Sequence, residues 1–371
     1  MRLVLQREIP DDDSLARQWN ELVWQMECPE VFYTYEWALA VSRAYCDSIT
    51  PLLILAYEQA SLVGVVALAT DTARQETFFL ARATADYCDF VSSPVRRPEF
   101  LDLVLDELRR LNIRALVAAS LPANSATVCA LAATQAHGYK TFSRPAQSCA
   151  QIKMGSSAER RGLRQFVANR KALRYSLKGL AKHGPVVIEH VRSGDSIQRA
   201  LPEFMQAHVT RFSAAGRQSN LAHPQRQAFL TELAGLLSAA DWIVLTRLLV
   251  GDRSIAWNYG FQFSGSWFYY QPTFDSEWRR FSPGFCLLSK IVEAGCDDPE
   301  IERVDMGLGA EGYKERFATG VRTTLDFIVT ASTTRYLKEA ARYHVAAAIK
   351  SSPRLEHSVR RVLRRVPAGG G

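Results

Sequence analysis

The sequence lacks the cysteine spacing of a disulfide or zinc framework. Its 371 residues include seven cysteines, an odd number, and no two of them stand in a CxxC arrangement. It also lacks a hydrophobic run of the roughly 20 residues that a bilayer-spanning helix needs, because polar residues interrupt apolar stretches such as 51–57 and 242–245. The first residues, MRLVLQREIPDDD, become acidic too early for a secretory signal peptide. We therefore expect a cytoplasmic protein without a metal ion.

Glycine and proline are also scarce, at 21 and 15 residues, which excludes collagen-like and low-complexity architectures. Hydrophobic residues make up 47% of the chain and charged residues 22%, which is the balance of a folded globular protein. This length and composition predict two domains, each with a sizeable core.

The positive net charge is confined to the C-terminal end. Residues 335–371 contain nine lysines and arginines against two acids, whereas the other 334 residues hold 36 bases and 36 acids. Between 355 and 366, apolar residues recur at helical spacing opposite a set of arginines, which predicts a basic amphipathic helix. This tail either packs on its own domain or binds an anionic membrane at the inner face, an acidic partner or RNA.

The first half alternates helix-like and strand-like segments. Residues 14–26 and 98–111 have helical periodicity, and the runs 51–57 and 62–69 are joined by EQAS, which predicts an antiparallel hairpin. Further strand candidates are 77–80, 87–91 and 115–119, and a further helix is expected at 125–137. The spacing favours an α/β half with hairpins over a strict βαβ winding.

The second half opens with a basic helical stretch at 156–183 that bridges the two halves. Helices are expected near 197–212 and at 225–239. Three strand candidates, an apolar helix, a strand and a short helix then follow at 242–250, 254–263, 266–275, 285–295, 302–306 and 312–318. The three strands are joined by turn residues and therefore predict a meander.

The turn RRFSPG at 279–284 leads from the third of these strands into the apolar helix. A helix start presents unpaired backbone N–H groups and a positive dipole end, and two guanidiniums stand alongside, so the place suits phosphate. Ser282 is placed to cap the helix, and Pro283 takes its first position. The phosphate-binding candidates are Arg279, Arg280, Ser282, Pro283, Gly284 and Phe285. An ordinary helix start explains the same residues, so the order of the surrounding elements decides between the two.

That order resembles the GNAT acyltransferase superfamily: antiparallel strands, a helix opened by a glycine, a strand, and a helix that bears a tyrosine. More specifically, the chain resembles the FemAB-like branch, which includes the CelD-like acetyltransferases of bacterial cellulose and exopolysaccharide biosynthesis, over residues 15–330. The segments that carry the resemblance are VFYTYEW (31–37), PLLILAYEQASLVGVVALA (51–69), DYCDFVSSP (86–94), AHVTRF (207–212), RSIAWNYGFQF (253–263), FYYQPTFDSEW (268–278), FSPGFCLL (281–288) and VDMGLGAEGYKERF (304–317).

The resemblance implies an α/β fold of mixed sheets, with two tandem GNAT-like domains facing one another across a cleft. We place the N-terminal domain at 1–152, the acyltransferase domain at 153–334 with the bridging basic helix at 153–184, and the basic tail at 335–371. Acetyl-CoA, or another acyl-CoA, is the implied co-substrate. Its pantetheine is expected between two splayed strands and its pyrophosphate at 282–285. GNAT turns usually carry several glycines where this chain has Gly284, so an aminoacyl-tRNA donor, as in Fem ligases, stays open.

The same resemblance implies the chemistry of the site. An amine or hydroxyl of the acceptor attacks a thioester carbonyl that backbone N–H groups polarise, and the departing thiolate needs a proton. Tyr313 matches the tyrosine that supplies this proton in the superfamily, and Lys314 is placed to steer the donor. Candidates for the base that takes the acceptor's proton are Asp305, Glu311, Asp275 and His208.

Acceptor-binding candidates come from three segments. Alternation along the third late strand puts Tyr269 and Gln271 on one face and Tyr270 on the other, and aromatic faces stack on pyranose rings. A polar stretch at 86–89 lies where the first half is expected to reach the cleft, and two arginines four residues apart on the bridging helix suit an anionic acceptor or a diphosphate. The candidates are Tyr269, Gln271, Asp275, Asp86, Tyr87, Asp89, Arg170 and Arg174. Sheet packing, a surface loop and a solvated helix face are the structural alternatives.

The leading hypothesis is an acyl-CoA-dependent N- or O-acyltransferase, with acetyl as the expected acyl group. The expected acceptor is a sugar or peptidyl precursor in exopolysaccharide or cell-envelope biosynthesis. One alternative is a Fem-type peptidyltransferase that uses aminoacyl-tRNA, in which case tRNA is the nucleic-acid partner. The other is a non-catalytic scaffold that uses its basic tail to sit beside a membrane-bound polysaccharide synthase.

Overall fold

The computed structural model describes residues 1–133, 138–309, 314 and 316–351. In these ranges the chain forms one mixed sheet of twelve strands in the order β1-β2-β3-β4-β5-β12-β6-β11-β10-β9-β8-β7, and the predicted α/β class is confirmed. The strands are β1 (Arg2–Gln6), β2 (Pro51–Glu58), β3 (Ser61–Asp71), β4 (Glu76–Phe79), β5 (Ala115–Pro122), β6 (Lys140–Lys153), β7 (Val186–Val191), β8 (Ile243–Val250), β9 (Arg253–Phe263), β10 (Ser266–Phe274), β11 (Arg303–Leu308) and β12 (Gly320–Thr330). The helices are α1 (Asp13–Trp24), η1 (Val31–Tyr33), α2 (Tyr35–Ala44), α3 (Arg97–Arg110), α4 (Ala126–Ala133), α5 (Ser157–Ala168), α6 (Lys171–Leu180), α7 (Gly194–Ala214), η2 (Asn220–Ala222), α8 (Pro224–Ser238), η3 (Ser276–Phe281), α9 (Pro283–Asp297) and α10 (Thr333–Ser351).

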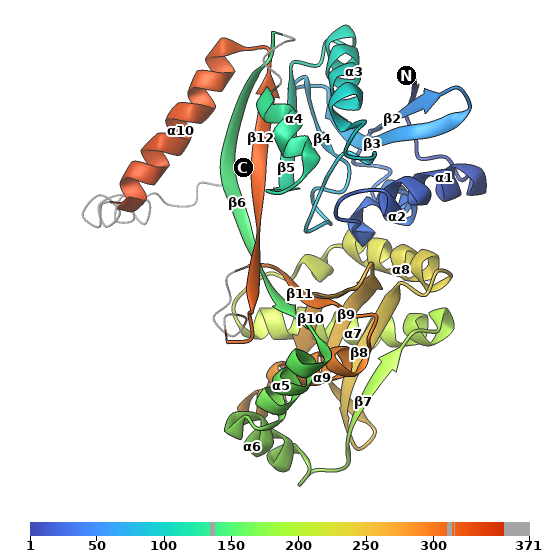
Figure 1. The fold of residues 1–371 in the computed structure, drawn as a ribbon. Helices are drawn as coiled ribbons and strands as arrows, with labels where there is room; N and C mark the ends of the chain where they lie inside the picture. The colour runs from blue at the N-terminus through green and yellow to red at the C-terminus, as the bar shows by residue number, and fades with distance from the viewer. Residues whose placement is uncertain (134–137, 310–313, 315, 352–371) are drawn as a thin grey trace.

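Each half of the sheet contains the same unit. In the first half, β2 and β3 lead antiparallel into β4, and α3 connects β4 to its parallel neighbour β5. In the second half, β8 and β9 lead antiparallel into β10, and α9 connects β10 to its parallel neighbour β11. The repetition confirms the expectation of two similar halves, which Figure 1 shows as an upper, blue-to-green body and a lower, green-to-orange body.

Two long strands tie the halves together. The C-terminal strand β12 returns to the first half, where it pairs with β5, and it pairs with β6 along most of its length. On its other edge, the end of β6 at 149–153 pairs with β11 of the second half. Figure 1 shows both strands running between the two bodies. The predicted domain boundary at 152/153 thus falls inside β6, and it stays a prediction.

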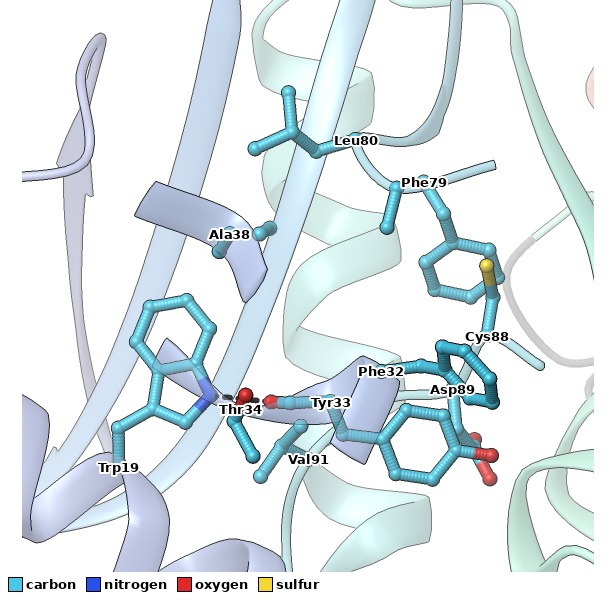
Figure 2. Close-up of a pocket in the computed structure, with 12 residues that line it drawn as sticks. Trp19, Phe32, Tyr33, Thr34, Ala38, Phe79, Leu80, Cys88, Asp89 and Val91 are labelled. Atoms are coloured by element: carbon cyan, nitrogen blue, oxygen red, sulfur yellow. Dashed lines mark hydrogen bonds between the residues drawn. The ribbon is translucent and has the colours of Figure 1, made fainter. Parts of the chain in front are cut away.

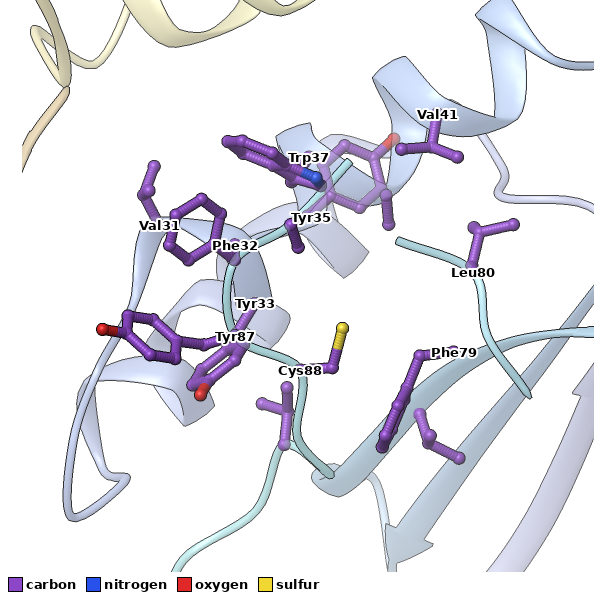
Figure 3. Close-up of a cluster of buried hydrophobic side chains, with 14 of the residues drawn as sticks. Val31, Phe32, Tyr33, Tyr35, Trp37, Val41, Phe79, Leu80, Tyr87 and Cys88 are labelled. Atoms are coloured by element: carbon purple, nitrogen blue, oxygen red, sulfur yellow. The ribbon is translucent and has the colours of Figure 1, made fainter. Parts of the chain in front are cut away.

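An aromatic core also crosses between the halves. Phe32 and Trp37 of the first half contact Phe261 edge-on, with ring centroids 6.4 and 5.3 Å apart, and Trp37 also meets Phe229 of α8 at 5.4 Å. Figure 3 shows the side of this cluster around Phe32, Trp37 and Tyr87. Because close-packed aromatic side chains interdigitate with few voids, the two halves hold a defined relative position.

Two expected elements differ from the prediction. The bridging stretch forms two helices instead of one. α5 begins with a capping box between Ser156 and Glu159 and ends at Ala168, and Arg170 takes an extended conformation before α6 begins. The strand expected at 87–91 is wrong: this segment is irregular and makes a single bridge, Val65 to Val91.

The C-terminal helix α10 lies beside the two connecting strands (Figure 1), where Phe142 of β6 contacts the rings of Tyr336 and Tyr343. The amphipathic segment expected at 355–366 lies outside the described residues. Among the helices that the structure does describe, none has both the length and the apolar character required to cross a bilayer.

Candidate functional site

The parallel strands β10 and β11 separate partway along their length. They pair over 266–268 and 303–305. Beyond that point both leave regular pairing, β10 through a bulge at 268–271 and β11 through a register shift at 305–308. The expectation of two splayed strands on either side of the apolar helix therefore has a direct counterpart here.

A short turn bends β11 away from its neighbour. The N–H of Gly307 donates to Oδ1 of Asp305 at 2.9 Å, and Gly307 has a φ of +67°, a conformation that glycine adopts without steric cost. The other carboxylate oxygen of Asp305 accepts from the hydroxyl of Tyr87 and from Nε2 of Gln151, both at 2.8 Å. Asp305 is 1% exposed and its side chain holds the bend.

A cavity of 480 Å³ opens where the strands separate. Its walls come from β10, β11, the first turn of α9, the end of α7 and a segment of the first half. The lining residues are Asp86, His208, Arg211, Phe212, Arg217, Tyr269, Tyr270, Gln271, Pro272, Thr273, Phe274, Arg279, Ser282, Gly284, Phe285, Met306, Gly307, Leu308 and Lys314. The structure thus brings phosphate-binding, base and acceptor-binding candidates together around one cavity.

The predicted phosphate turn lies at one end of this cavity. Pro283 is the first residue of α9, as expected, and Gly284 follows it in the lining. The predicted side-chain cap is wrong, because Ser282 has a φ of +48° and makes no capping hydrogen bond. A Cβ at Gly284 would lie 3.3 Å from the ring of Phe274, so the glycine keeps the helix start close to β10. Pro283 has no N–H, and the N–H groups of Phe285 and Cys286 donate to the carbonyl of Ser282 at 3.0 and 3.1 Å.

The two arginines of the turn behave differently. Arg279 lines the cavity, whereas the guanidinium of Arg280 lies 4.6 Å from the ring centroid of Phe281 and is not part of the lining. Two further arginines line the cavity, Arg211 in the last turn of α7 and Arg217 just after this helix. Sequence reasoning singled out the segment 207–212 but assigned these two no role, although arginines at the polar end of a helix were a usable signal.

Strand alternation fails at the bulge. Tyr269, Tyr270 and Gln271 all line the cavity, although alternation predicts Tyr270 on the opposite face. The bulge inserts one unpaired residue and so breaks the period of two. The hydroxyl of Tyr270 accepts from Arg226 at 2.6 Å and donates to the carbonyl of Thr84, so this ring also fixes the segment that enters from the first half.

His208 of α7 lies on the cavity wall with both ring nitrogens engaged. Nδ1 is 2.8 Å from Oγ of Ser219, and Nε2 accepts from Nε2 of Gln271 at 2.7 Å. The ring stacks on Phe212 with centroids 4.4 Å apart. Burial, followed by the charge of the neighbouring arginines, lowers the pKa of His208 to about 4. The imidazole is therefore neutral at pH 7.

Asp86 reaches the cavity from the first half. Its Oδ2 lies 2.6 Å from the position that a Cβ on Gly307 would take, so only a glycine there admits the carboxylate. Burial and, to a smaller extent, the nearby charge of Asp305 raise the pKa of Asp86 to about 7. Lys314 and a hydrogen bond from the backbone of Leu308 oppose this rise. Lys314 is itself 4% exposed and donates from Nζ to the carbonyl of Leu308 at 3.0 Å.

The matching gap of the first half is filled. After β4 the segment 80–92 folds back, with the N–H of Cys88 donating to the carbonyl of Ser120 at 3.1 Å and Val91 bridging to Val65. Asp89 of this segment does not line the large cavity. It pairs with the fully buried Arg97 at 3.2 Å and borders a separate cavity of 40 Å³, shown in Figure 2.

The remaining candidates lie elsewhere. Asp275 caps η3 and pairs with Arg253 at 2.6 Å, outside the cavity lining. Arg170 stacks on Phe317 and on Phe285, with its guanidinium 4.6 and 5.8 Å from the two ring centroids, and thus supports one wall from behind. Arg174 borders a different groove between α5, α6 and α9. Tyr313 and Glu311 lie outside the described residues.

Comparisons with known proteins agree with this geometry. Residues 168–315 match the family model of an acetyltransferase (GNAT) domain. No curated protein sequence matches the chain significantly.

Solved structures resemble the chain over most of its length. FemX superposes with a TM-score of 0.61 at 9% identity, covering 84% of this chain and 95% of FemX. L-PGS from Bacillus licheniformis gives 0.57 at 9% identity, covering 94% and 99%. The C-terminal domain of a protein described as a lysylphosphatidylglycerol synthetase, from Agrobacterium fabrum, gives 0.55 at 11% identity, covering 91% and 96%. At these identities the likeness shows a shared fold.

The matched family domain contains β10, α9 and β11, the unit around which the cavity opens. The chain therefore carries a GNAT acetyltransferase domain, matched over residues 168–315, within a fold that it shares with FemX.

Proposed function

We propose that the protein transfers an acyl group, with acetyl as the expected one, from acyl-CoA to an amine or hydroxyl of a sugar or peptidyl precursor. The observation that carries this proposal is the 480 Å³ cavity between the separating strands β10 and β11, with the N-terminus of α9 at its end. Acyl-CoA supplies the activated thioester. The chain's part is to hold that thioester and to bring an acceptor to it.

Charge favours an anionic donor in this cavity. Among the described residues, four cationic side chains line it, Arg211, Arg217, Arg279 and Lys314, against the single carboxyl group of Asp86. Arg279 and the first turn of α9 both line the cavity, and the positive end of the helix dipole suits a pyrophosphate. The unpaired edges of β10 and β11 present backbone groups to an extended chain such as pantetheine.

Acceptor binding is proposed along the wall that contains Tyr269, Gln271 and His208. Aromatic and amide side chains in one wall suit a sugar or a peptide. Cell-envelope or exopolysaccharide assembly is the proposed context, with the protein cytoplasmic or peripheral at the inner face of the membrane through its basic tail.

A second candidate is transfer from aminoacyl-tRNA. The superposition on FemX and on a protein described as a lysylphosphatidylglycerol synthetase supports this alternative. The cationic lining does not distinguish acyl-CoA from aminoacyl-tRNA, since both donors carry phosphate.

The test is donor binding measured by thermal shift, because a ligand that binds only the folded state raises Tm. We expect acetyl-CoA to raise Tm, and Gly284→Leu to weaken its affinity about tenfold or more, because the new side chain enters the cavity beside Phe274. Gly235→Leu on α8 is the matched control, since its nearest neighbour is Nε2 of Gln198 at 3.9 Å.

The outcomes separate the alternatives. No shift with acetyl-CoA together with binding of charged tRNA supports the Fem-type donor. Unchanged acetyl-CoA affinity in Gly284→Leu contradicts the placement of the donor at α9. If the protein never releases free CoA and removal of 335–371 abolishes its recovery with membranes, the scaffold interpretation gains.

A further inference from the structure

We propose that Asp86 is the catalytic base, supplied to the acyltransferase domain by the N-terminal half. This inference rests on the proposed function. It assigns a catalytic residue outside the region 168–315 that the family model matches. It also gives the N-terminal half, whose own gap is filled, a part in the reaction.

The segment around Asp86 is held on both sides. Two residues before it, Thr84 receives a hydrogen bond from Nε1 of Trp37 on its hydroxyl at 3.0 Å, and its carbonyl accepts from Tyr270. One residue after it, the hydroxyl of Tyr87 donates to Asp305 of β11 at 2.8 Å. These contacts join the first half to β10 and β11 at the point where the strands separate. Asp86 is therefore presented to the cavity by a fixed backbone.

Gly307 provides the space for the carboxylate. Its left-handed φ turns β11 away, and the absence of a Cβ leaves room for Oδ2 of Asp86. The carboxyl group thus sits against the strand beside which the thioester is proposed to lie. A Cβ at this position would force the carboxylate of Asp86 to shift from its place.

The other described candidates for the base are less suitable. The carboxylate of Asp305 is occupied on both oxygens and lies outside the lining. Asp275 is paired with Arg253 outside the cavity. His208 has both nitrogens hydrogen-bonded, and a pKa near 4 makes its imidazole a weak proton acceptor. Among the described lining residues, Asp86 is the only carboxylic acid.

The charged groups that face Asp86 set its proton affinity near the working pH. Asp305 on β11 disfavours its ionisation, whereas Lys314 and Arg226 of α8 favour it. Burial adds the largest contribution and brings the pKa to about 7. A base is most effective when its pKa lies near the operating pH, since it is then both ionised and able to hold a proton.

The step balances as follows. Asp86 takes the proton of the acceptor N–H or O–H while the acceptor atom bonds to the thioester carbonyl carbon. Collapse of the tetrahedral intermediate breaks the C–S bond. The thiolate takes one proton from water, and the protonated Asp86 returns its own to water, so no net proton or electron is left over.

The experiment follows release of free CoA from acetyl-CoA by chromatography, with D-glucosamine or with water as the acceptor, from pH 5.5 to 9. Hydrolysis removes the acceptor's own titration from the pH profile. We expect kcat of the full-length protein to rise to a plateau with an apparent pKa near 7. Asp86→Asn should lower kcat on the plateau by about 100-fold or more and leave the Tm increase caused by acetyl-CoA unchanged.

Two further variants test the assignment. Lys314→Gln removes the nearby positive charge and should move the rise of kcat to higher pH at saturating acetyl-CoA. Asp241→Asn makes the same chemical change at an exposed aspartate that pairs with Arg192, and should leave the profile unaltered.

The possible results test the assignment of Asp86 as the base. A kcat for Asp86→Asn within threefold of the parent, or an unchanged acid limb in Lys314→Gln, overturns the base. No Tm increase with acetyl-CoA overturns the proposed function and the base with it. A Tm increase without CoA release by the parent protein overturns both the transfer chemistry and the base, while donor binding stands.

Discussion

The ionised carboxylate of Asp86 lowers the free energy of unfolding. An uncharged residue at position 86 would not have this effect. The carboxyl group is half-buried in the cavity, and its pKa is raised from 3.8 to about 7, chiefly by burial. Below pH 3.8 the folded and unfolded chains both carry the neutral acid. As the pH rises, the unfolded chain loses its proton first, so stability is lost progressively up to the folded pKa near 7 and stays reduced above it.

The magnitude follows from the pKa. At 1.36 kcal/mol per pKa unit, a rise from 3.8 to about 7 corresponds to an upper limit of about 4 kcal/mol. Solvent in the cavity reduces this figure, and we expect Asp86→Asn to stabilise the protein by about 2 kcal/mol at pH 8. Each kcal/mol moves Tm by about 2–4 °C in domains of 150–250 residues, so the variant should melt about 4–8 °C above the parent.

The assay is thermal unfolding followed by circular dichroism at pH 4, 6 and 8 without ligand. The two melting temperatures should converge at pH 4 and diverge as the pH rises. Asp241→Asn serves as the control because Asp241 is exposed. If the Tm of Asp86→Asn at pH 8 equals or falls below that of the parent, ionisation of Asp86 in the cavity does not destabilise the fold and the reasoning is refuted.

The remaining predictions concern the elements that form the cavity. Gly307→Ala should abolish CoA release and destabilise the fold more than Gly251→Ala does. Both variants lose about 1 kcal/mol because the backbone is left-handed, but only Gly307→Ala places its new Cβ 2.6 Å from a carboxylate. Equal urea midpoints for the two variants would contradict this prediction. Arg322→Ala should destabilise the fold by about 3–5 kcal/mol in urea unfolding, because it leaves the fully buried Glu30 without its cation. Arg144→Ala breaks an exposed pair and should cost at most about 1 kcal/mol, so similar losses at the two arginines would argue against a buried ion pair.

The order of elements around the cavity was predictable from the sequence. Local patterns carry that information: hydrophobic periodicity marks β8 to β10 and α9, and the turn residues at 279–284 mark the start of the helix. The basic character of the tail and the absence of a cysteine framework are likewise properties of composition. These signals act over a few neighbouring residues, so no tertiary contact is needed to read them.

The detailed geometry of the cavity was decided by tertiary contacts. The bulge that brings Tyr270 into the lining depends on pairing with β9, and no local pattern announces it. The exchange of β6 and β12 between the halves joins residues more than 170 positions apart, such as Gln147 and Thr324. Local periodicity is the same whichever neighbour a strand selects.

The same reason explains why Asp86 was predicted as an acceptor contact and not as a base. Its proton affinity depends on burial and on Asp305 and Lys314, which lie more than 200 residues further along the chain. Its place depends on the missing Cβ of Gly307. The sequence by itself determined which secondary-structure elements form and in what order, whereas the packing of the two halves decided which side chains meet, because electrostatic and steric effects act through space and not along the chain.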